Sequence, residues 1–112
     1  MNEYGWRPLH IAAQKDFRDV AHLLLEKGAD VDARADSDQT PLHIAAEENS
    51  ADVARLLIQK CADLEAKTKD GKTPLQHALY LNMAQMLIGK GADKSGIDLK
   101  ELLSEDVEEQ PW

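Results

Sequence analysis

The chain has 112 residues and a formal net charge of −8 at pH 7, and 43% of its residues are apolar, 30% charged and only 4% aromatic. This length suits a single globular domain, and the shortage of aromatic residues favours closely packed helices. An acidic chain without a basic stripe argues against nucleic acid or an anionic membrane as a partner. The single cysteine, Cys61, excludes an intrachain disulfide. No segment approaches the ~20 consecutive apolar residues of a membrane span, so we expect a cytoplasmic protein. We also expect it to be monomeric.

Two helices are predicted within the first 34 residues. The first begins at Pro8, because proline suits the first turn of a helix, and ends near Asp16, because aspartate tolerates the left-handed conformation that ends helices. Its buried face is expected to consist of Leu9, Ala12 and Ala13. The second helix runs from about Asp19 to Lys27 and is followed by Gly28. Its apolar face consists of Val20, Leu23, Leu24 and Leu25.

The same plan occurs three times. The prolines at 8, 41 and 74 lie 33 residues apart. They begin three similar runs, namely Arg7-Pro8-Leu9-His10-Ile11-Ala12-Ala13, Thr40-Pro41-Leu42-His43-Ile44-Ala45-Ala46 and Thr73-Pro74-Leu75-Gln76-His77-Ala78-Leu79. A fixed period of this length is typical of a stacked repeat array. The second copy follows the first closely, except that Cys61 replaces Gly28, which costs roughly 1 kcal/mol if that position is left-handed.

The third copy is shorter than the second. Pro41 and Cys61 are 20 residues apart, whereas Pro74 and Gly91 are only 17 apart. The apolar residues of the second predicted helix align with those of the second copy only if the loss falls between the two helices, around Tyr80-Leu81-Asn82. We therefore expect a tight turn between the helices of this copy.

The repeat plan ends after Asp93, because no further Thr-Pro-Leu-His run follows. Asp98 suits a helix cap, and the apolar residues around it would cover the open end of an array; they are Ile97, Leu99, Leu102 and Leu103. We therefore divide the chain into repeats at residues 1–34, 35–67 and 68–93, a capping helix at 94–104 and an acidic tail at 105–112.

These runs resemble ankyrin repeats, which have a 33-residue period and combine Thr-Pro-Leu-His with an alanine pair, Leu-Leu and Gly-Ala-Asp. The resemblance covers residues 4 to about 93 and departs from the signature at Arg7, Gln76, His77 and Leu79. It implies a mainly α ankyrin solenoid of three repeats plus a C-terminal capping helix, in which helix-turn-helix pairs alternate with β-turn fingers. It further implies a non-enzymatic module that binds another protein on its concave face, which the fingers and first helices form.

Candidate binding residues flank the repeated motif. Positions just before each proline are expected at the finger tips, and positions six and seven after it at the end of the first helix, facing the same groove. The predicted protein-binding set is Tyr4, Trp6, Gln14, Lys15, Asp36, Gln39, Glu47, Glu48, Lys69, Asp70, Lys72 and Tyr80. Trp6 leads because Trp and Tyr are enriched at binding hot spots, although it would also serve to cover the open edge of the first repeat. The pair Glu47-Glu48, with lysines on both sides, favours a partner of mixed charge, or is simply a solvated face.

The histidines and the cysteine favour structural roles. The resemblance implies that His10 and His43 hydrogen-bond the backbone of a neighbouring loop. His22 lies on a polar outer stripe, and His77, which replaces an apolar residue, is predicted to be partly buried. No histidine pair has the spacing of a zinc hydrolase, and Cys61 at a helix C-terminus lacks the setting that stabilises a thiolate. We therefore predict no catalytic residue, no metal site and no cofactor.

Two other hypotheses remain open. The chain is also consistent with a regulatory or targeting fragment of a larger ankyrin-containing enzyme, channel or secreted effector. The second hypothesis is a small-molecule or metal-dependent function through His77 and Cys61.

Overall fold

The computed structural model describes residues 5–93. The predicted capping helix at 94–104, the acidic tail at 105–112 and Tyr4 lie outside the described residues. The helices of the described part are α1 (Pro8–Lys15), α2 (Arg18–Glu26), η1 (Asp36–Asp38, a 3-10 turn), α3 (Pro41–Glu48), α4 (Ala51–Gln59), α5 (Pro74–His77) and α6 (Leu81–Gly89). Residues 5–93 contain no β-strand.

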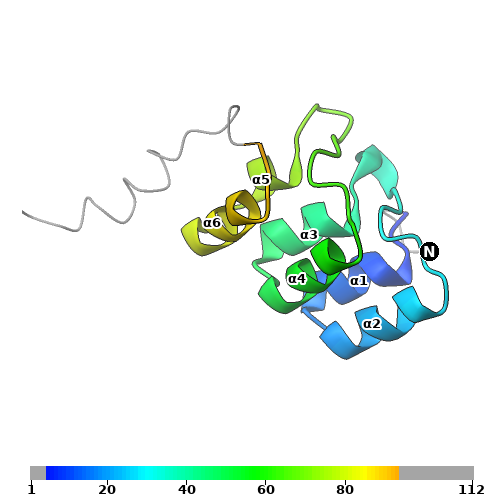
Figure 1. The fold of residues 1–112 in the computed structure, drawn as a ribbon. Coiled ribbons are helices and arrows are strands. Elements are labelled where there is room, and N and C mark those ends of the chain that lie inside the picture. Colours follow the sequence, from blue (N-terminus) through cyan, green and yellow to red (C-terminus); the bar gives the residue numbers. More distant parts are fainter. Residues whose placement is uncertain (1–4, 94–112) are drawn as a thin grey trace, which may run out of the picture.

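The helices form three pairs that stack side by side (Figure 1). One layer holds α1, α3 and α5, and the other holds α2, α4 and α6 (Figure 1). Within the layers α1 packs on α3, α3 on α5, and α2 on α4. The core between them is built from leucines and alanines at the repeated positions, and the small alanines allow the helices to approach closely; examples are Leu9, Ala12, Ala13, Leu42, Ala45 and Ala46.

The repeated motif forms the start of each first helix. In α3 the N–H of Thr40 donates to Nδ1 of His43 at 3.1 Å, and the N–H of His43 donates to Oγ1 of Thr40 at 3.3 Å. These reciprocal bonds satisfy N–H groups that have no partner inside the helix. Gln76 takes the place of the histidine in α5, where its Oε1 accepts from the N–H of Thr73 at 3.0 Å. The motif is therefore a packing and capping unit.

Left-handed residues end the helices where the sequence predicts them. Asp16 follows α1 with a φ of 56°, and Asn49 follows α3 with a φ of 58°. Gly28 follows α2 with a φ of 96°, and Cys61 occupies the equivalent position after α4 with a φ of 69°. Cys61 therefore meets the condition under which a non-glycine residue at this position is strained.

The shortening of the third repeat falls in a different place from the one predicted. The alignment itself is correct, because Met83 and Leu87 are buried like Val53 and Leu57. The loss, however, removes the last turn of α5, which has 4 residues where α3 has 8. Ala78 ends α5 in an extended conformation, with φ −70° and ψ 119°, so the chain leaves the helix one turn early. The predicted tight turn is therefore wrong.

The apolar face of α2 is only partly covered. Ala21 is buried and Leu24 and Leu25 pack against the core, but Val20 and Leu23 are exposed. Burial of these two side chains would need a further packing element beyond α2.

Candidate functional site

Variable residues of the first two repeats meet in one hollow of about 350 Å³. It is lined by Trp6, Gln14, Asp36, Ser37, Gln39, Ile44, Glu47 and Glu48. Six of these residues belong to the predicted binding set, and they lie at four places in the chain, of which Trp6, just before α1, is the first. Gln14 lies in the last turn of α1, the two glutamates lie in the last turn of α3, and Asp36 and Gln39 lie in the loop between the helix pairs.

The first finger, residues 35–39, is held in a fixed shape. The N–H of Ala35 donates to the carbonyl of Gln39 at 2.9 Å, and the N–H of Asp38 donates to the carbonyl of Ala35 at 3.0 Å. Ser37 and Asp38 are left-handed, with φ values of 67° and 62°, which turns the chain sharply at the tip. Short polar residues tolerate this conformation better than branched ones.

Buried histidines fasten each finger to the helices. Nδ1 of His10 accepts from the N–H of Arg7 at 3.0 Å, so the other ring nitrogen carries the proton and donates to the carbonyl of Gln39 at 2.9 Å. His43 repeats this arrangement and donates from Nε2 to the carbonyl of Lys72 at 2.8 Å. The family expectation for these two histidines is therefore met.

Both rings are neutral because burial disfavours the imidazolium. Burial lowers the pKa of His10, and it lowers the pKa of His43 from 6.5 to about 4 against the opposing effect of the bond to Lys72. A neutral ring accepts at one nitrogen and donates at the other, which is what these bonds need.

The second finger, residues 68–72, lies beside the first. The N–H of Lys69 donates to the carbonyl of Ser37 at 2.9 Å. The Arg34 guanidinium donates to the carbonyl of Asp38 at 2.7 Å and to that of Lys67 at 2.9 Å, and so links the first finger to the residue that precedes the second. Sequence reasoning missed Arg34. A basic residue stands at this position in both copies, as Arg34 and Lys67, and that repetition was the available signal.

The charges on this surface are separated. Asp36, Glu47 and Glu48 line the hollow, and its lining contains no lysine or arginine. The neighbouring finger instead carries Lys69 and Lys72 on exposed positions beside Asp70. The surface therefore presents an acidic hollow next to a mainly basic finger.

The remaining predicted residues lie around the hollow or away from it. Lys15, the last residue of α1, is exposed next to Gln14. Tyr80 was predicted at the end of a first helix, but it stands just before α6 and is exposed, because α5 ends early. Sequence reasoning also missed Ser37 at the finger tip and Ile44, a motif residue whose edge reaches the hollow.

Trp6 lies on the hollow and also packs against the core. Its side chain is partly buried and lines the same space as Gln14 and Asp36. It is absent from the lining of a second hollow, of about 480 Å³, which lies beside Pro8 and Leu24. The tryptophan thus both packs against the core and lines the hollow.

His77 connects this surface to the core. It is partly buried, as predicted, and its Nδ1 lies 3.4 Å from Oε1 of Glu47. Its ring meets that of His43 edge-on, with the centroids 5.0 Å apart. These contacts give His77 a structural role beside the hollow.

The metal-ligating side chains of the described residues do not gather into a metal site. Among residues 5–93, no group of three His, Cys, Asp or Glu side chains is placed to hold a metal ion. Cys61 is exposed at the end of α4. No helix in the described part is long and apolar enough to cross a membrane.

Comparison with known proteins adds the family. A family model described as ankyrin repeats (3 copies) matches residues 31–98, and one described as ankyrin repeat matches residues 4–36. A search of curated proteins gives no match. The two family matches cover most of the sequence and agree with the stacked helix pairs. The chain belongs to the ankyrin repeat family, whose members are generally non-catalytic protein–protein interaction modules.

Proposed function

We propose that this protein binds a partner protein through the hollow between the first finger and the ends of α1 and α3. The observation that carries the proposal is the convergence of variable residues. Glu47, Glu48 and Asp36 differ from their counterparts in the other copies, whereas the motif beside them repeats. Residues that differ between the copies, held by a motif that stays the same, are what a surface specific for one partner would show.

The surface is suited to binding because its backbone is already ordered. The fingers are tied to each other through Arg34 and to the helices through His10 and His43. Binding would therefore cost little conformational entropy on this side, because the face is already ordered. Trp6 offers a flat apolar contact at one side of the hollow, and such residues often dominate binding energy.

The charge pattern supports a partner of mixed charge. A cation on the partner would face the carboxylates of Asp36, Glu47 and Glu48, and an acidic group would face Lys69 and Lys72. Complementary charges of this kind mainly set the orientation and the rate of association.

Capture of partners from a cell extract tests the proposal. The parent chain is compared with Trp6→Ala and with the double variant Glu47→Lys plus Glu48→Lys. Lys60→Glu, an exposed change at the end of α4, is the matched control for altered charge. We expect one partner to be captured by the parent chain and the control, and to be lost from both hollow variants. A partner retained equally by all four chains would remove this surface from consideration.

A further inference from the structure

A histidine and a glutamate meet where the third repeat packs on the second. Nδ1 of His77 lies 3.4 Å from Oε1 of Glu47, and the two side chains are 15% and 46% exposed. The residues 33 positions earlier, Ile44 and Gln14, carry no charge and both line the hollow. Both members of the pair therefore differ from their counterparts, and this interface, unlike the one before it, has a titratable pair at this place.

His43 lies on another side of the His77 ring. The two rings meet edge-on, with their centroids 5.0 Å apart and their planes at 72°. Both nitrogens of His43 are used, because Nδ1 accepts from the N–H of Thr40 and Nε2 donates to the carbonyl of Lys72. Burial lowers the pKa of His43 from 6.5 to about 4, so this ring stays neutral between pH 5 and 8. Histidine is the side chain that ordinarily changes charge in that range, and His77 is the other histidine of the cluster.

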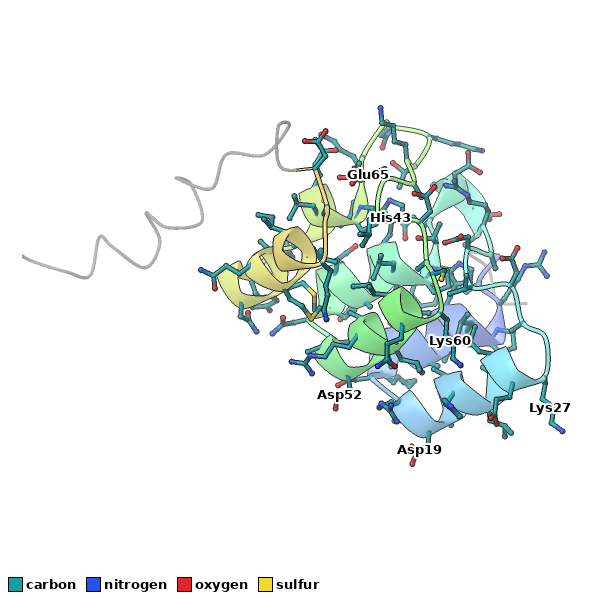
Figure 2. All side chains as sticks on the ribbon, viewed as in Figure 1. Asp19, Lys27, His43, Asp52, Lys60 and Glu65 are labelled. Atoms are coloured by element: carbon teal, nitrogen blue, oxygen red, sulfur yellow. The ribbon has the colours of Figure 1, made fainter. Side chains whose placement is uncertain are left out.

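The elements packed against α5 leave Glu47 as the charged partner of His77 in the described chain. Helix α3 brings His43 and Glu47 to the ring, and α6 has no titratable residue. The finger that precedes α5 carries exposed charges, namely Lys69, Asp70 and Lys72. Figure 2 shows His43 among the first helices and the fingers, whereas Asp19 and Asp52 lie in the other layer, on α2 and α4.

Glu47 belongs both to this pair and to the hollow. It lines the hollow together with Asp36 and Glu48, and no lysine or arginine is in the lining. A proton on His77 would place a positive charge beside one of these three carboxylates and would hold Oε1 of Glu47 in an ion pair. The hollow would then present less negative charge to a bound group.

We propose that His77 makes recognition at the hollow dependent on pH, because its protonated ring pairs with Glu47. This inference rests on the proposed function, in which the carboxylates of the hollow face a cation of the partner. The affinity for such a cation falls as the pH decreases from 7.5 to 5.5. By linkage, a bound cation opposes protonation of His77 to the same degree. His77 is thus a positioning residue for Glu47.

A nuclear magnetic resonance titration of the free chain tests the pair without a partner. Between pH 8 and pH 5.5 the signal of the Glu47 carboxyl carbon should change in step with that of the His77 ring. His77→Gln keeps a polar side chain without a titrating ring, and His77→Ile restores the residue that the other two copies have. Both variants should keep the circular dichroism of the parent chain and lose this step. A parent chain without the step, or variants that retain it, would overturn the inference.

Binding of a cationic probe tests the effect on the hollow. The probe is acetyl-arginine amide, whose guanidinium keeps its charge throughout this pH range. Its Kd, followed through the indole N–H of Trp6, should be about threefold higher at pH 5.5 than at pH 7.5. His77→Ile and Glu47→Gln should each reduce this ratio to about one. A parent chain with the same Kd at both pH values, or one that binds the probe at neither, would overturn the inference.

Glu48→Gln is the matched control, because Glu48 lines the hollow but has no ion pair within residues 5–93. It should weaken probe binding at both pH values and keep the ratio of the parent chain. Loss of the ratio in Glu48→Gln would assign the pH response to the hollow as a whole and overturn the role of His77. Capture from extract distinguishes the two proposals, since a partner retained by the hollow variants would refute the proposed function while the step and the probe ratio persisted.

Discussion

Oδ1 of Asp16 accepts a hydrogen bond from the N–H of Val53 at 3.0 Å, and so the end of the first helix of one repeat caps the second helix of the next. Val53 lies in the first turn of α4, where N–H groups have no partner inside the helix. The equivalent residue one repeat later, Asn49, has a buried Oδ1 without a hydrogen-bond partner in the described chain. The shortened α5 leads into α6 differently, and the inter-repeat cap is lost there.

This difference predicts opposite effects of one substitution at equivalent sites. Asp16→Gly should lower the free energy of unfolding by about 1 kcal/mol, because the cap is lost while glycine still adopts the left-handed conformation. Asn49→Gly should raise it by up to about 1 kcal/mol, because an unpaired buried oxygen is removed. Urea unfolding of both variants measures the two effects. Equal destabilisation by both would show that the Asp16 bond is not a cap.

Cys61 provides a second stability test. It is a left-handed residue with a φ of 69° at the position that glycine holds in the other repeats, as Gly28 and Gly91. Cys61→Gly should raise the free energy of unfolding by about 1 kcal/mol, because the strain of a side chain at this φ is relieved. Gly28→Ala, with a φ of 96°, should have the reverse effect in the same denaturation experiment. A destabilising Cys61→Gly would mean that the thiol makes contacts worth more than the strain.

Buried His43 predicts a specific pH dependence. Its pKa is about 4 in the folded protein and 6.5 ordinarily, so the unfolded chain binds the additional proton between these values. The contribution of His43 to the free energy of unfolding is therefore fully present above about pH 6.5. It decreases by about 3 kcal/mol as the pH falls to about 4. The lowered pKa of His10 acts in the same direction.

The variant that tests this dependence is His43→Gln, because glutamine holds the same position in the third repeat, as Gln76. The loss of unfolding free energy between pH 7.5 and pH 4 should be about 3 kcal/mol smaller in this variant than in the parent chain. A similar pH slope for the parent chain and His43→Gln would assign the acid sensitivity to other groups.

Arg34 should control the order of the fingers. Arg34→Ala removes the donors to the carbonyls of Asp38 and Lys67, so the amides of residues 36–39 and 68–72 should exchange their hydrogens faster. Arg34→Lys is the matched control, since it keeps the charge but loses the fixed planar N–H directions with which Nη1 donates to both carbonyls. It is expected to show faster exchange too. If exchange stayed slow in Arg34→Lys but not in Arg34→Ala, the positive charge, and not the pair of hydrogen bonds, would be what orders the fingers.

Much of the architecture was predictable because the same sequence pattern occurs in three copies. The prolines, the buried histidines and the left-handed ends at Asp16 and Cys61 follow from local chemistry that recurs at a fixed spacing. The place at which the third repeat is shortened was not predictable. The alignment of the repeats shows how many residues are missing, but not whether they are missing from the turn or from the end of a helix. Ala78 adopts an extended conformation that its residue type does not require.

The sequence predicted the residues that the regular helix pairs bring to the hollow, but not the residues whose contacts depend on neighbouring elements. Gln14, Asp36 and Glu47 meet because regular helix pairs bring equivalent positions to one groove. Arg34, in contrast, reaches the carbonyls of Asp38 and Lys67 with a long side chain, and no local sequence pattern encodes this pair of hydrogen bonds. The exposure of Leu23 depends on which elements lie beside α2, and its residue type alone indicates burial.

Hydrogen–deuterium exchange of the chain, free and bound to a captured partner, tests the central claim most directly. If the hollow is the recognition surface, binding should slow exchange of the amides at residues 35–39 and at the end of α3 around Glu47 and Glu48. The outer faces of α2 and α4 should be unaffected by that partner. Protection confined to α2 and α4, with the finger and the end of α3 unchanged, would contradict the claim.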